Sequence, residues 1–287
     1  MKLHTINTGF FKLDGGAMFG VVPKVMWNKI NPADENNLCS WAMRCLLIED
    51  SNRLILVDNG IGNKQDAKFF SHYYLHGDDT LDNSLQQLGF HRDDITDVFL
   101  THLHFDHCGG SIERKGDKLV PAFQNAVYWS NASHWNWAVH PNDREKASFL
   151  KENILPIQES GQLKFVDETK PAEGKVLSTT SFLPNFDIIF VNGHTSQMML
   201  PRLKYKDKTI VYTADLLPSA GHIPLPYVMA YDMFPLTTLK EKKEFLSEAA
   251  AENHILFFEH DAQNECCDLQ MTEKGVRPGN FFKLAEI

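Results

Sequence analysis

The chain has 287 residues, of which 43% are hydrophobic and 23% are charged, a composition typical of a soluble globular protein with a large core. Its formal net charge of −9 disfavours nucleic acid as a partner, because an acidic surface repels phosphate backbones. No apolar run reaches the length of a signal peptide or a membrane span, so no membrane partner is expected. The five cysteines include no CxxC pair, which argues against a thiolate zinc site, and cytoplasmic residence is the simplest interpretation.

The first hundred residues are expected to form mostly short strands. Two apolar runs, 41–48 and 53–58, flank a turn at 50–52, a pattern that predicts a hairpin. A helix is predicted to begin at about 78–80 and to stop at Gly89, because leucines recur at helical spacing between these points. Residues 95–100 then form a short apolar strand that leads directly into a cluster of histidines.

The remainder of the chain alternates between predicted strands and helices. Helices are expected at about 142–155 and 237–253. No repeat or Gly/Ser linker divides the chain, so we expect a single domain over residues 1–287. Successive blocks of strands followed by helices favour a β-rich core with helices outside it, and therefore the α/β class. Strands are predicted at 126–129, 186–191, 198–203, 209–213 and 255–258.

The segment after the strand at 95–100 carries the most informative pattern, with His102, His104, Asp106 and His107 inside six residues. Imidazole nitrogen and carboxylate oxygen are suitable ligands for zinc and similar divalent ions. In an extended exit from a strand, residues i and i+2 point the same way, so His102 and His104 can hold one ion. The turn that follows, with two glycines at 109–110, lets Asp106 and His107 face a second position.

Three later ligand-type residues, His194, Asp215 and His260, each follow a predicted strand. Strand ends are held by a rigid scaffold and open onto loops that can carry a substrate pocket. Together with the histidine cluster, these residues predict a centre for two metal ions. Asp106 and Asp215 are also candidates to carry a proton to the leaving group, in addition to binding metal.

The run His-x-His-x-Asp-His, followed by Gly-His-Thr, Thr-Ala-Asp and a strand that ends in Glu-His, resembles the metallo-β-lactamase superfamily. The resemblance implies an αββα four-layer sandwich with the site at the strand ends. It implies two divalent ions, zinc being expected and manganese, iron or cobalt the alternatives. The implied roles are His102, His104 and His194 on one ion, Asp106, His107 and His260 on the other, Asp215 as the bridge, and Asp58 as a group that orients a ligand histidine.

Further residues narrow the branch of the family. Asp215 argues against antibiotic hydrolysis, because true β-lactamases of this superfamily generally lack the bridging aspartate. No second histidine follows His194 closely, and Pro218 stands where small lactonases tend to carry a tyrosine, so these departures weaken a match to the glyoxalase II and small-lactonase branches. Segments 15–24 and 225–232 resemble the branch that contains quorum-quenching N-acyl homoserine lactonases and methyl-parathion-hydrolase-like enzymes.

The expected function is the opening of a lactone, or of a related carboxylic ester, by a hydroxide that bridges the two metals. A phosphotriesterase is the nearest alternative, since the same hydroxide can attack phosphorus. An iron-dependent oxidoreductase and a non-catalytic binding protein are more remote, because all the ligands are present. The expected partner is a small lactone or ester, and a homodimer is left open.

Candidate substrate contacts are His222, which lies in the loop after Asp215, and the apolar residues Phe19, Trp27 and Phe105. An apolar wall beside the ions would suit an acyl chain or an aryl leaving group. The alternatives are a solvated loop position for the histidine and core packing for the aromatics. Cys108 is expected to be a small packing residue, because thiolates have no place in this ligand set.

Overall fold

The computed structural model describes residues 1–287. The residue contacts group the chain into two compact units, each assembled from two separate stretches of sequence. Residues 1–9 and 43–167 form the first unit, and residues 10–42 and 168–287 form the second. The expectation of a single domain stays a prediction.

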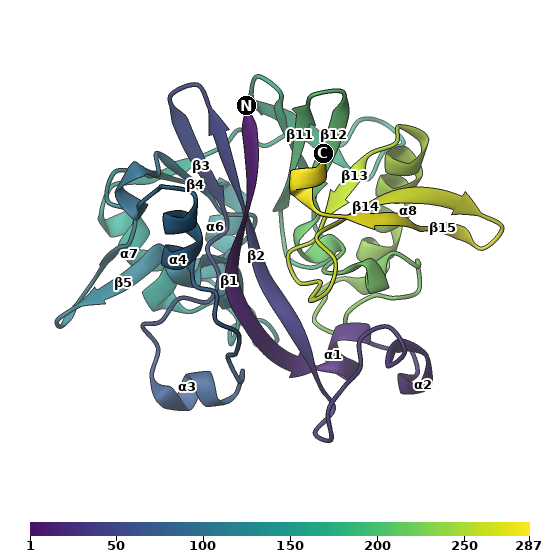
Figure 1. Ribbon diagram of the computed structural model, residues 1–287, viewed down its shortest axis with the longest axis horizontal. Coiled ribbons are helices and arrows are strands. Elements are labelled where there is room, and N and C mark those ends of the chain that lie inside the picture. Colours follow the sequence, from purple (N-terminus) through teal and green to yellow (C-terminus); the bar gives the residue numbers. More distant parts are fainter. The chain divides into compact units, whose positions relative to one another are not determined.

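The first unit is built on a six-stranded sheet with the order β1-β2-β3-β4-β7-β8 (Figure 1). β2 and β3 pair antiparallel, which confirms the predicted hairpin, and β3, β4, β7 and β8 run parallel. β1 and β2 are 13 residues long each, longer than the short strands expected, and the chain passes between the units within them. The strand bounds are β1 Lys2–Asp14, β2 Leu38–Asp50, β3 Arg53–Val57, β4 Asp97–Phe99, β7 Val127–Ser130 and β8 Leu163–Phe165, with a separate hairpin of β5 Ile112–Lys115 and β6 Lys118–Pro121.

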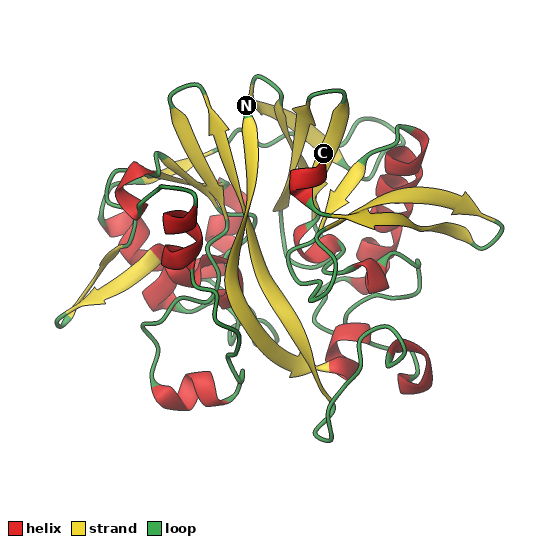
Figure 2. Cartoon of the chain, in the orientation of Figure 1, coloured by secondary structure: helices red, strands yellow, loops and turns green.

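Helices cover this sheet through one continuous hydrophobic cluster (Figure 2). Leu81 and Leu85 of α4, Trp135 of α6 and Ile157 of α7 all belong to it, together with apolar strand residues. The predicted stop of α4 is confirmed, since Gly89 has a φ of 81° that favours glycine. The helices are α3 Ala67–Ser71, α4 Leu81–Gln87, α5 Phe105–Cys108, α6 Ala132–Val139 and α7 Lys151–Glu159, with 3-10 turns η1 Arg92–Asp94 and η2 Gly109–Ser111.

The helix predicted at about 142–155 is wrong in its first half. The helices observed here are α6, which ends at Val139, and α7, which begins only at Lys151. Between them, the side chain of Asn142 accepts hydrogen bonds from the backbone N–H groups of Arg144 and Glu145, at 2.9 and 3.1 Å. This local bond gives the backbone a partner in a turn, and so competes with a helix.

The second unit contains a seven-stranded sheet with the order β15-β14-β13-β12-β11-β10-β9. All neighbouring pairs are antiparallel except β12 and β13, which run parallel. The four strands predicted in this part of the chain are confirmed, with β10 at the predicted residues and the others shifted by two residues or fewer. The strands are β9 Ser178–Leu183, β10 Phe186–Val191, β11 Met198–Tyr205, β12 Lys208–Tyr212, β13 Ile255–Phe257, β14 Cys266–Thr272 and β15 Gly275–Phe282.

One long helix, α8, packs against β14 and β15 and buries Phe245 and Leu246 (Figure 1). It confirms the helix predicted at 237–253. Proline at its first position is favourable, because the missing N–H would have no partner inside the helix. The helices of this unit are α1 Gly15–Phe19, α2 Lys24–Trp27 and α8 Pro235–Ala251, with 3-10 turns η3 Ala214–Leu216, η4 Ala220–His222 and η5 Leu284–Glu286.

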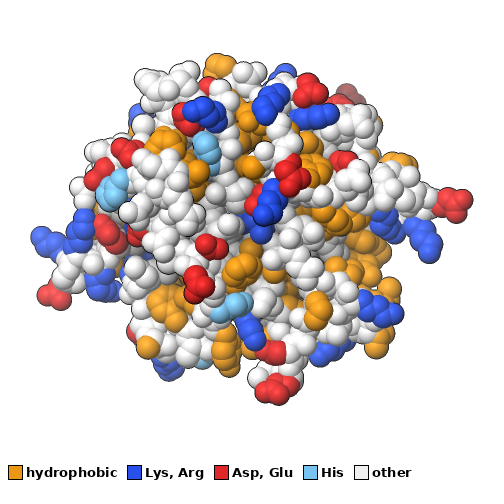
Figure 3. Space-filling model, viewed as in Figure 1, with side chains coloured by type: hydrophobic (Ala, Val, Ile, Leu, Met, Phe, Trp, Pro, Cys, Tyr) orange, Lys and Arg blue, Asp and Glu red, His pale blue; other side chains and the backbone are white.

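Two protruding hairpins of the chain carry charged side chains. Charged side chains gather at the tips of the β5–β6 and β14–β15 hairpins (Figure 3). In the first of these, Lys115 lies 2.7 Å from Glu113. Charges at such positions disfavour pairing with a strand of another molecule. None of the helices combines the length and the apolar character that crossing a bilayer requires.

Candidate metal centre

The first ligand cluster, which comprises His102, His104, Asp106 and His107, lies in the first unit, as does Asp58, the residue expected to orient a ligand histidine. His102 and His104 are buried on the extended backbone that leaves β4, and α5 begins immediately after them. Their Nε2 and Nδ1 atoms, respectively, lie 3.1 Å apart. Two nitrogens bound at about 2.0–2.1 Å to one tetrahedral ion would lie about 3.3 Å apart, so this spacing suits a shared zinc-like ion.

The proton on His102 can be assigned from its neighbours. The Thr101 hydroxyl donates to Asp58 Oδ2 at 2.6 Å, so its oxygen accepts a hydrogen bond from His102 Nδ1 at 3.1 Å. His102 therefore carries its proton on Nδ1 and turns the lone pair of Nε2 toward His104.

A buried carboxylate indicates in the same way which nitrogen of His104 carries the proton. His104 Nε2 donates to Glu145 Oε1 at 3.0 Å, which leaves the lone pair on Nδ1. The other oxygen of Glu145 accepts hydrogen bonds from Trp137 Nε1 at 2.6 Å and from Asn142 Nδ2 at 3.3 Å. His102 Nε2 and His104 Nδ1 are thus the ring nitrogens that face each other across 3.1 Å, and in neutral rings with these tautomers both offer a lone pair to an ion.

Asp58 fixes the third imidazole. His107 Nδ1 donates to Asp58 Oδ2 at 3.1 Å, and the other Asp58 oxygen accepts from the Thr101 backbone N–H at 2.8 Å. His107 Nε2 then points toward Asp106, whose Oδ2 lies 3.8 Å away. This pair offers a nitrogen and an oxygen to a second ion. Asp58 has a φ of 55°, an uncommon value for a residue other than glycine.

The backbone around this cluster is packed so tightly that two of its positions accept only glycine. A Cβ atom at Gly109 would lie 2.1 Å from the carbonyl oxygen of Ile61, and one at Gly110 would lie 2.3 Å from that of Asn59. His134, which we did not predict as part of the site, is fully buried, and its Nε2 accepts a hydrogen bond from the Leu103 N–H at 2.9 Å. The tight packing at Gly109 and Gly110 and the hydrogen bond between Leu103 and His134 therefore fix the backbone that carries the histidines.

The second ligand cluster, which comprises His194, Asp215 and His260, lies in the second unit. His194 follows β10, Asp215 lies in η3 after β12, and His260 follows β13. The two oxygens of Asp215 face different histidines: Oδ2 is 3.1 Å from His194 Nε2, and Oδ1 is 3.2 Å from His260 Nε2. This geometry suits a carboxylate that bridges two ions, each of which also binds one histidine.

The outer nitrogens of these two histidines also have acceptors. His194 Nδ1 donates to Asp232 Oδ1 at 2.9 Å, and His260 Nδ1 donates to the carbonyl oxygen of Ala42 at 2.7 Å. Each Nε2 thus faces an oxygen of Asp215 at a distance at which one metal ion could bind both atoms. Such outer hydrogen bonds set the tautomer and orientation of metal-binding histidines. The side chains of both clusters fit resident divalent ions.

A family model described as the metallo-beta-lactamase superfamily matches residues 44–260. The chain belongs to the metallo-β-lactamase superfamily.

Three relatives illustrate the likeness to this superfamily. The N-acyl homoserine lactonase AiiA of Bacillus thuringiensis subsp. kurstaki is 26% identical over 274 residues, which cover 92% of this chain and 94% of the relative. A probable metal-dependent hydrolase from Staphylococcus aureus superimposes with a TM-score of 0.86 and 25% identity, over 98% of this chain and 96% of that one. AidC, a dizinc quorum-quenching lactonase solved in complex with a product, gives a TM-score of 0.77 at 21% identity, over 98% and 95%.

These comparisons confirm the expected fold class, α/β with the αββα metallo-β-lactamase fold. They also confirm the expected enzyme class, a metal-dependent hydrolase of this superfamily.

His222 is buried, although we considered it as a substrate contact in an open loop. Its Nε2 donates to the Met18 carbonyl at 2.9 Å, its Nδ1 accepts from the Ser219 hydroxyl at 2.9 Å, and its ring stacks on Phe19 with centroids 4.6 Å apart. Burial lowers the pKa of His222 to about 3, so the ring is neutral near pH 7. Phe19 also stacks on Trp27 at 5.5 Å, and this geometry favours packing for all three rings over direct contact with substrate.

Phe105 has different surroundings from the other predicted aromatics. Its ring lies 5.5 Å from that of Phe69 and 4.7 Å from that of Tyr73, and both of these are half-buried. Burial, together with the nearby charge of Asp106, raises the pKa of Tyr73 to about 12. The three rings form an apolar group directly beside the first ligand cluster. Cys108 is fully buried, and its Sγ donates to the Leu103 carbonyl at 3.3 Å, as a packing residue would.

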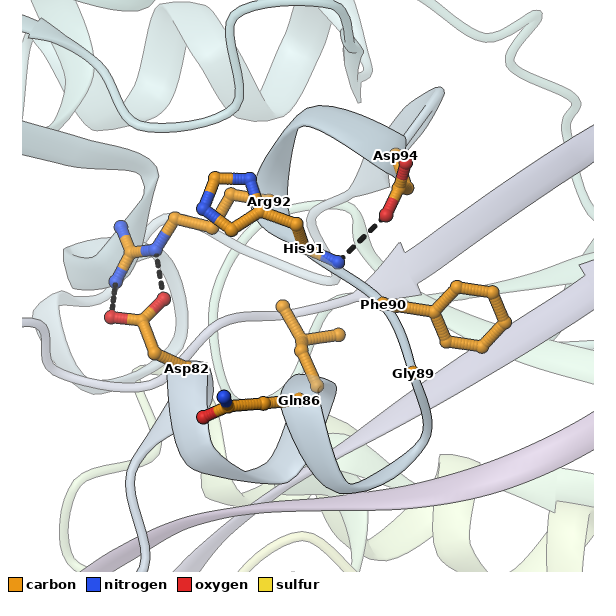
Figure 4. Close-up of a pocket in the computed structure, with 8 residues that line it drawn as sticks. Asp82, Gln86, Gly89, Phe90, His91, Arg92 and Asp94 are labelled. Atoms are coloured by element: carbon orange, nitrogen blue, oxygen red, sulfur yellow. Dashed lines mark hydrogen bonds and ion pairs between the residues drawn. The ribbon is translucent and has the colours of Figure 1, made fainter.

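A pocket of about 430 Å³ lies elsewhere in the first unit, between α4 and η1 (Figure 4). Within it, Arg92 makes two bonds to Asp82, at 2.5 and 3.0 Å, and the His91 N–H donates to Asp94 at 2.7 Å. None of the residues predicted as ligands or substrate contacts lines it, so the pocket is separate from the predicted site.

Proposed function

We propose that the predicted ligand residues hold two divalent metal ions, zinc being expected, and that the chain uses them to open a lactone or a related carboxylic ester. The observation that carries this proposal is the close pairing of ligand-type atoms within each cluster. His102 Nε2 lies 3.1 Å from His104 Nδ1, and the two oxygens of Asp215 lie 3.1 and 3.2 Å from Nε2 of His194 and of His260. The dizinc centre named for AidC supports the same number of ions.

When bound, the ions would activate a water molecule and polarise the carbonyl oxygen of the substrate. The residues of the chain supply orientation and proton transfer. Thr101, Glu145, Asp58 and Asp232 would hold the ligand rings in the tautomers that keep their inner nitrogens unprotonated. Asp106 and Asp215, both nearly buried, remain the candidates to carry a proton to the leaving alkoxide.

The surroundings of Asp106 support the proposed substrate class. Phe69, Tyr73 and Phe105 give this side of the cluster an apolar wall, which suits an acyl chain better than a charged substrate. The curated relatives named as N-acyl homoserine lactonases support the same class.

The test combines metal analysis with initial rates on N-hexanoyl homoserine lactone and on paraoxon. We expect about two ions per chain and faster lactone opening than paraoxon cleavage. Asp215→Asn should lower the metal content toward one ion per chain and sharply reduce lactone opening, whereas Asp207→Asn, a change at an exposed aspartate beside Lys208, should alter neither. Two ions with fast paraoxon cleavage and little lactone opening would favour a phosphotriesterase, and less than one ion per chain would overturn the proposal.

The apolar wall can be tested separately through chain length. Phe69→Ala should weaken the preference for a ten-carbon over a four-carbon acyl lactone, mainly through KM. Phe281→Ala, at an exposed position on β15, is the matched control and should leave that preference unchanged. An unchanged preference in Phe69→Ala would remove this wall from the substrate site.

A further inference from the structure

Helix α8 buries two adjacent charged residues, Glu241 and Lys242, whose side chains are 1% and 0% exposed. Charged groups are rarely buried to this degree, because they lose their hydration, and they persist only where other bonds replace it. Burial raises the pKa of Glu241 to about 7 and lowers the pKa of Lys242 to about 7, which indicates how unfavourable these positions are for charge. Both side chains are bonded to backbone groups.

Glu241 binds the backbone immediately before His194. Its Oε1 accepts from the Asn192 N–H at 2.6 Å, and its Oε2 accepts from the Gly193 N–H at 2.9 Å. The same segment is held from the other side, since the N–H groups of Met233 and Phe234 donate to the His194 and Gly193 carbonyls at 3.0 and 2.8 Å.

The side chain of residue 193 is restricted by the same helix. A Cβ atom there would lie 2.2 Å from Thr238 Oγ1 and 2.4 Å from Thr238 N, so only glycine fits. The backbone that leads into His194 is therefore pressed against α8 as well as bonded to it.

Lys242 binds the turn that leads toward Asp232, the acceptor of the His194 ring. Its Nζ donates to the carbonyls of Pro224, Leu225 and Tyr227, at 3.1, 3.4 and 2.7 Å. An ammonium group has three N–H donors, and each finds one carbonyl here. One turn of α8 thus holds both the backbone that carries His194 and the loop that leads to its partner.

We propose that Glu241 and Lys242 are positioning residues of the metal centre, which aim His194 Nε2 by clamping residues 192–194 and the 224–232 loop onto α8. The inference rests on the proposed function only in taking His194 as a metal ligand. Neither residue touches the reacting groups. Their effect on the ions passes through the His194 ring and its bond to Asp232.

The chain offers matched controls on the same helix. Glu244 makes the same kind of contact, since its carboxylate accepts from the N–H groups of Val176 and Leu177, but these precede no predicted ligand. Glu241→Gln keeps the shape of the side chain and turns one acceptor into a donor that faces an N–H group. Glu244→Gln makes the same change at the control position. Lys242→Met is matched by Lys243→Met, at an exposed lysine.

The readouts are the zinc dissociation constants, from competition with a chromophoric chelator, and the visible spectrum of the cobalt-loaded protein. Glu241→Gln and Lys242→Met should each weaken the binding of one of the two ions about tenfold and change the spectrum of the cobalt-loaded protein. Glu244→Gln and Lys243→Met should leave both readouts at the wild-type values. Thermal unfolding of the metal-free proteins reports any general loss of stability.

Loss of stability in Glu241→Gln with wild-type metal affinity and spectrum would overturn the inference, because the clamp would then be structural only. An equal loss of affinity in Glu244→Gln would overturn it as well. If Glu241→Gln does not fold, Glu241→Asp, with a carboxylate one methylene shorter, is judged by the same criteria. Failure of the proposed metal centre is distinguishable, since the wild-type protein itself would then take up no cobalt.

Discussion

Replacing Glu145 by glutamine tests the assignment of the His104 proton. Glu145 is buried, with one oxygen on His104 Nε2 and the other on the indole N–H of Trp137 and the amide of Asn142. A glutamine cannot satisfy both sides. If its carbonyl faces His104, its NH₂ group faces the two donors. If it turns over, the NH₂ group faces His104 Nε2 and drives the proton to Nδ1, the nitrogen that faces His102.

The size of the effect follows from the bond that is lost. A buried donor without an acceptor costs about 1–3 kcal/mol, which corresponds to roughly a 5- to 150-fold change in an equilibrium constant. Losses on removing an outer partner of a metal ligand are typically about 10- to 100-fold, within the same range. We therefore expect Glu145→Gln to weaken binding of the ion at His102 and His104 by about 10- to 100-fold.

The assay is competition for zinc against a chromophoric chelator, with metal content after dialysis as a second measure. Glu152→Gln is the control, because this exposed glutamate accepts a hydrogen bond from Gln65 at 3.1 Å and no predicted ligand is involved. Wild-type affinity in Glu145→Gln, or an equal loss in Glu152→Gln, would refute the assigned tautomer and its role.

Three further predictions concern the second unit. Asp215→Asn should reduce the metal content from two ions toward one and sharply lower turnover, as measured by elemental analysis and initial rates; full activity with both ions would contradict the bridging role. The low pKa of His222, about 3, means that the unfolded chain takes up a proton below pH 6.5 that the folded chain does not, so stability falls with falling pH in this range. Between pH 6 and pH 4, the free energy of unfolding of the wild type should therefore fall more steeply than that of His222→Gln, by up to about 1.4 kcal/mol per pH unit. Urea unfolding at several pH values measures this difference, and parallel curves for the two proteins would count against it. Gly193→Ala should lower stability by about 1–3 kcal/mol because of the contact with Thr238, and an unchanged melting temperature would contradict that close packing.

Much of the fold could be predicted because its signals are local. The hairpin of β2 and β3, the stop of α4 at Gly89 and the apolar strand β10 each follow from a few neighbouring residues. The helix at 142–155 could not be placed correctly, because the Asn142 side chain and the backbone compete for the same N–H groups.

In the candidate site, too, some residues could be predicted from local patterns and others could not. The candidate ligands are recognisable from the spacing of one motif and from the strand ends that precede His194, Asp215 and His260. Of the groups that orient them, Asp58 was expected from the family resemblance, whereas Glu145 and Asp232 were missed, because Glu145 is 41 residues from His104 and Asp232 is 38 residues from His194. No local pattern marks such a partner. One further signal lies in α8, where the charged residues Glu241 and Lys242 occupy the buried side of the helix.

The interleaved chain path has a consequence for synthesis of the protein. Residues 10–42 pack with a unit whose other residues begin only at position 168. A ribosome that adds about 5–20 residues per second needs roughly 6–25 s to cover the interval between them. During that time Phe19, Trp27 and Trp41, all buried in the finished fold, lack their later neighbours, whereas the sheet of residues 43–167 can already form. Until residues 168–287 follow, the early segment thus leaves these apolar side chains open to contact with other nascent chains.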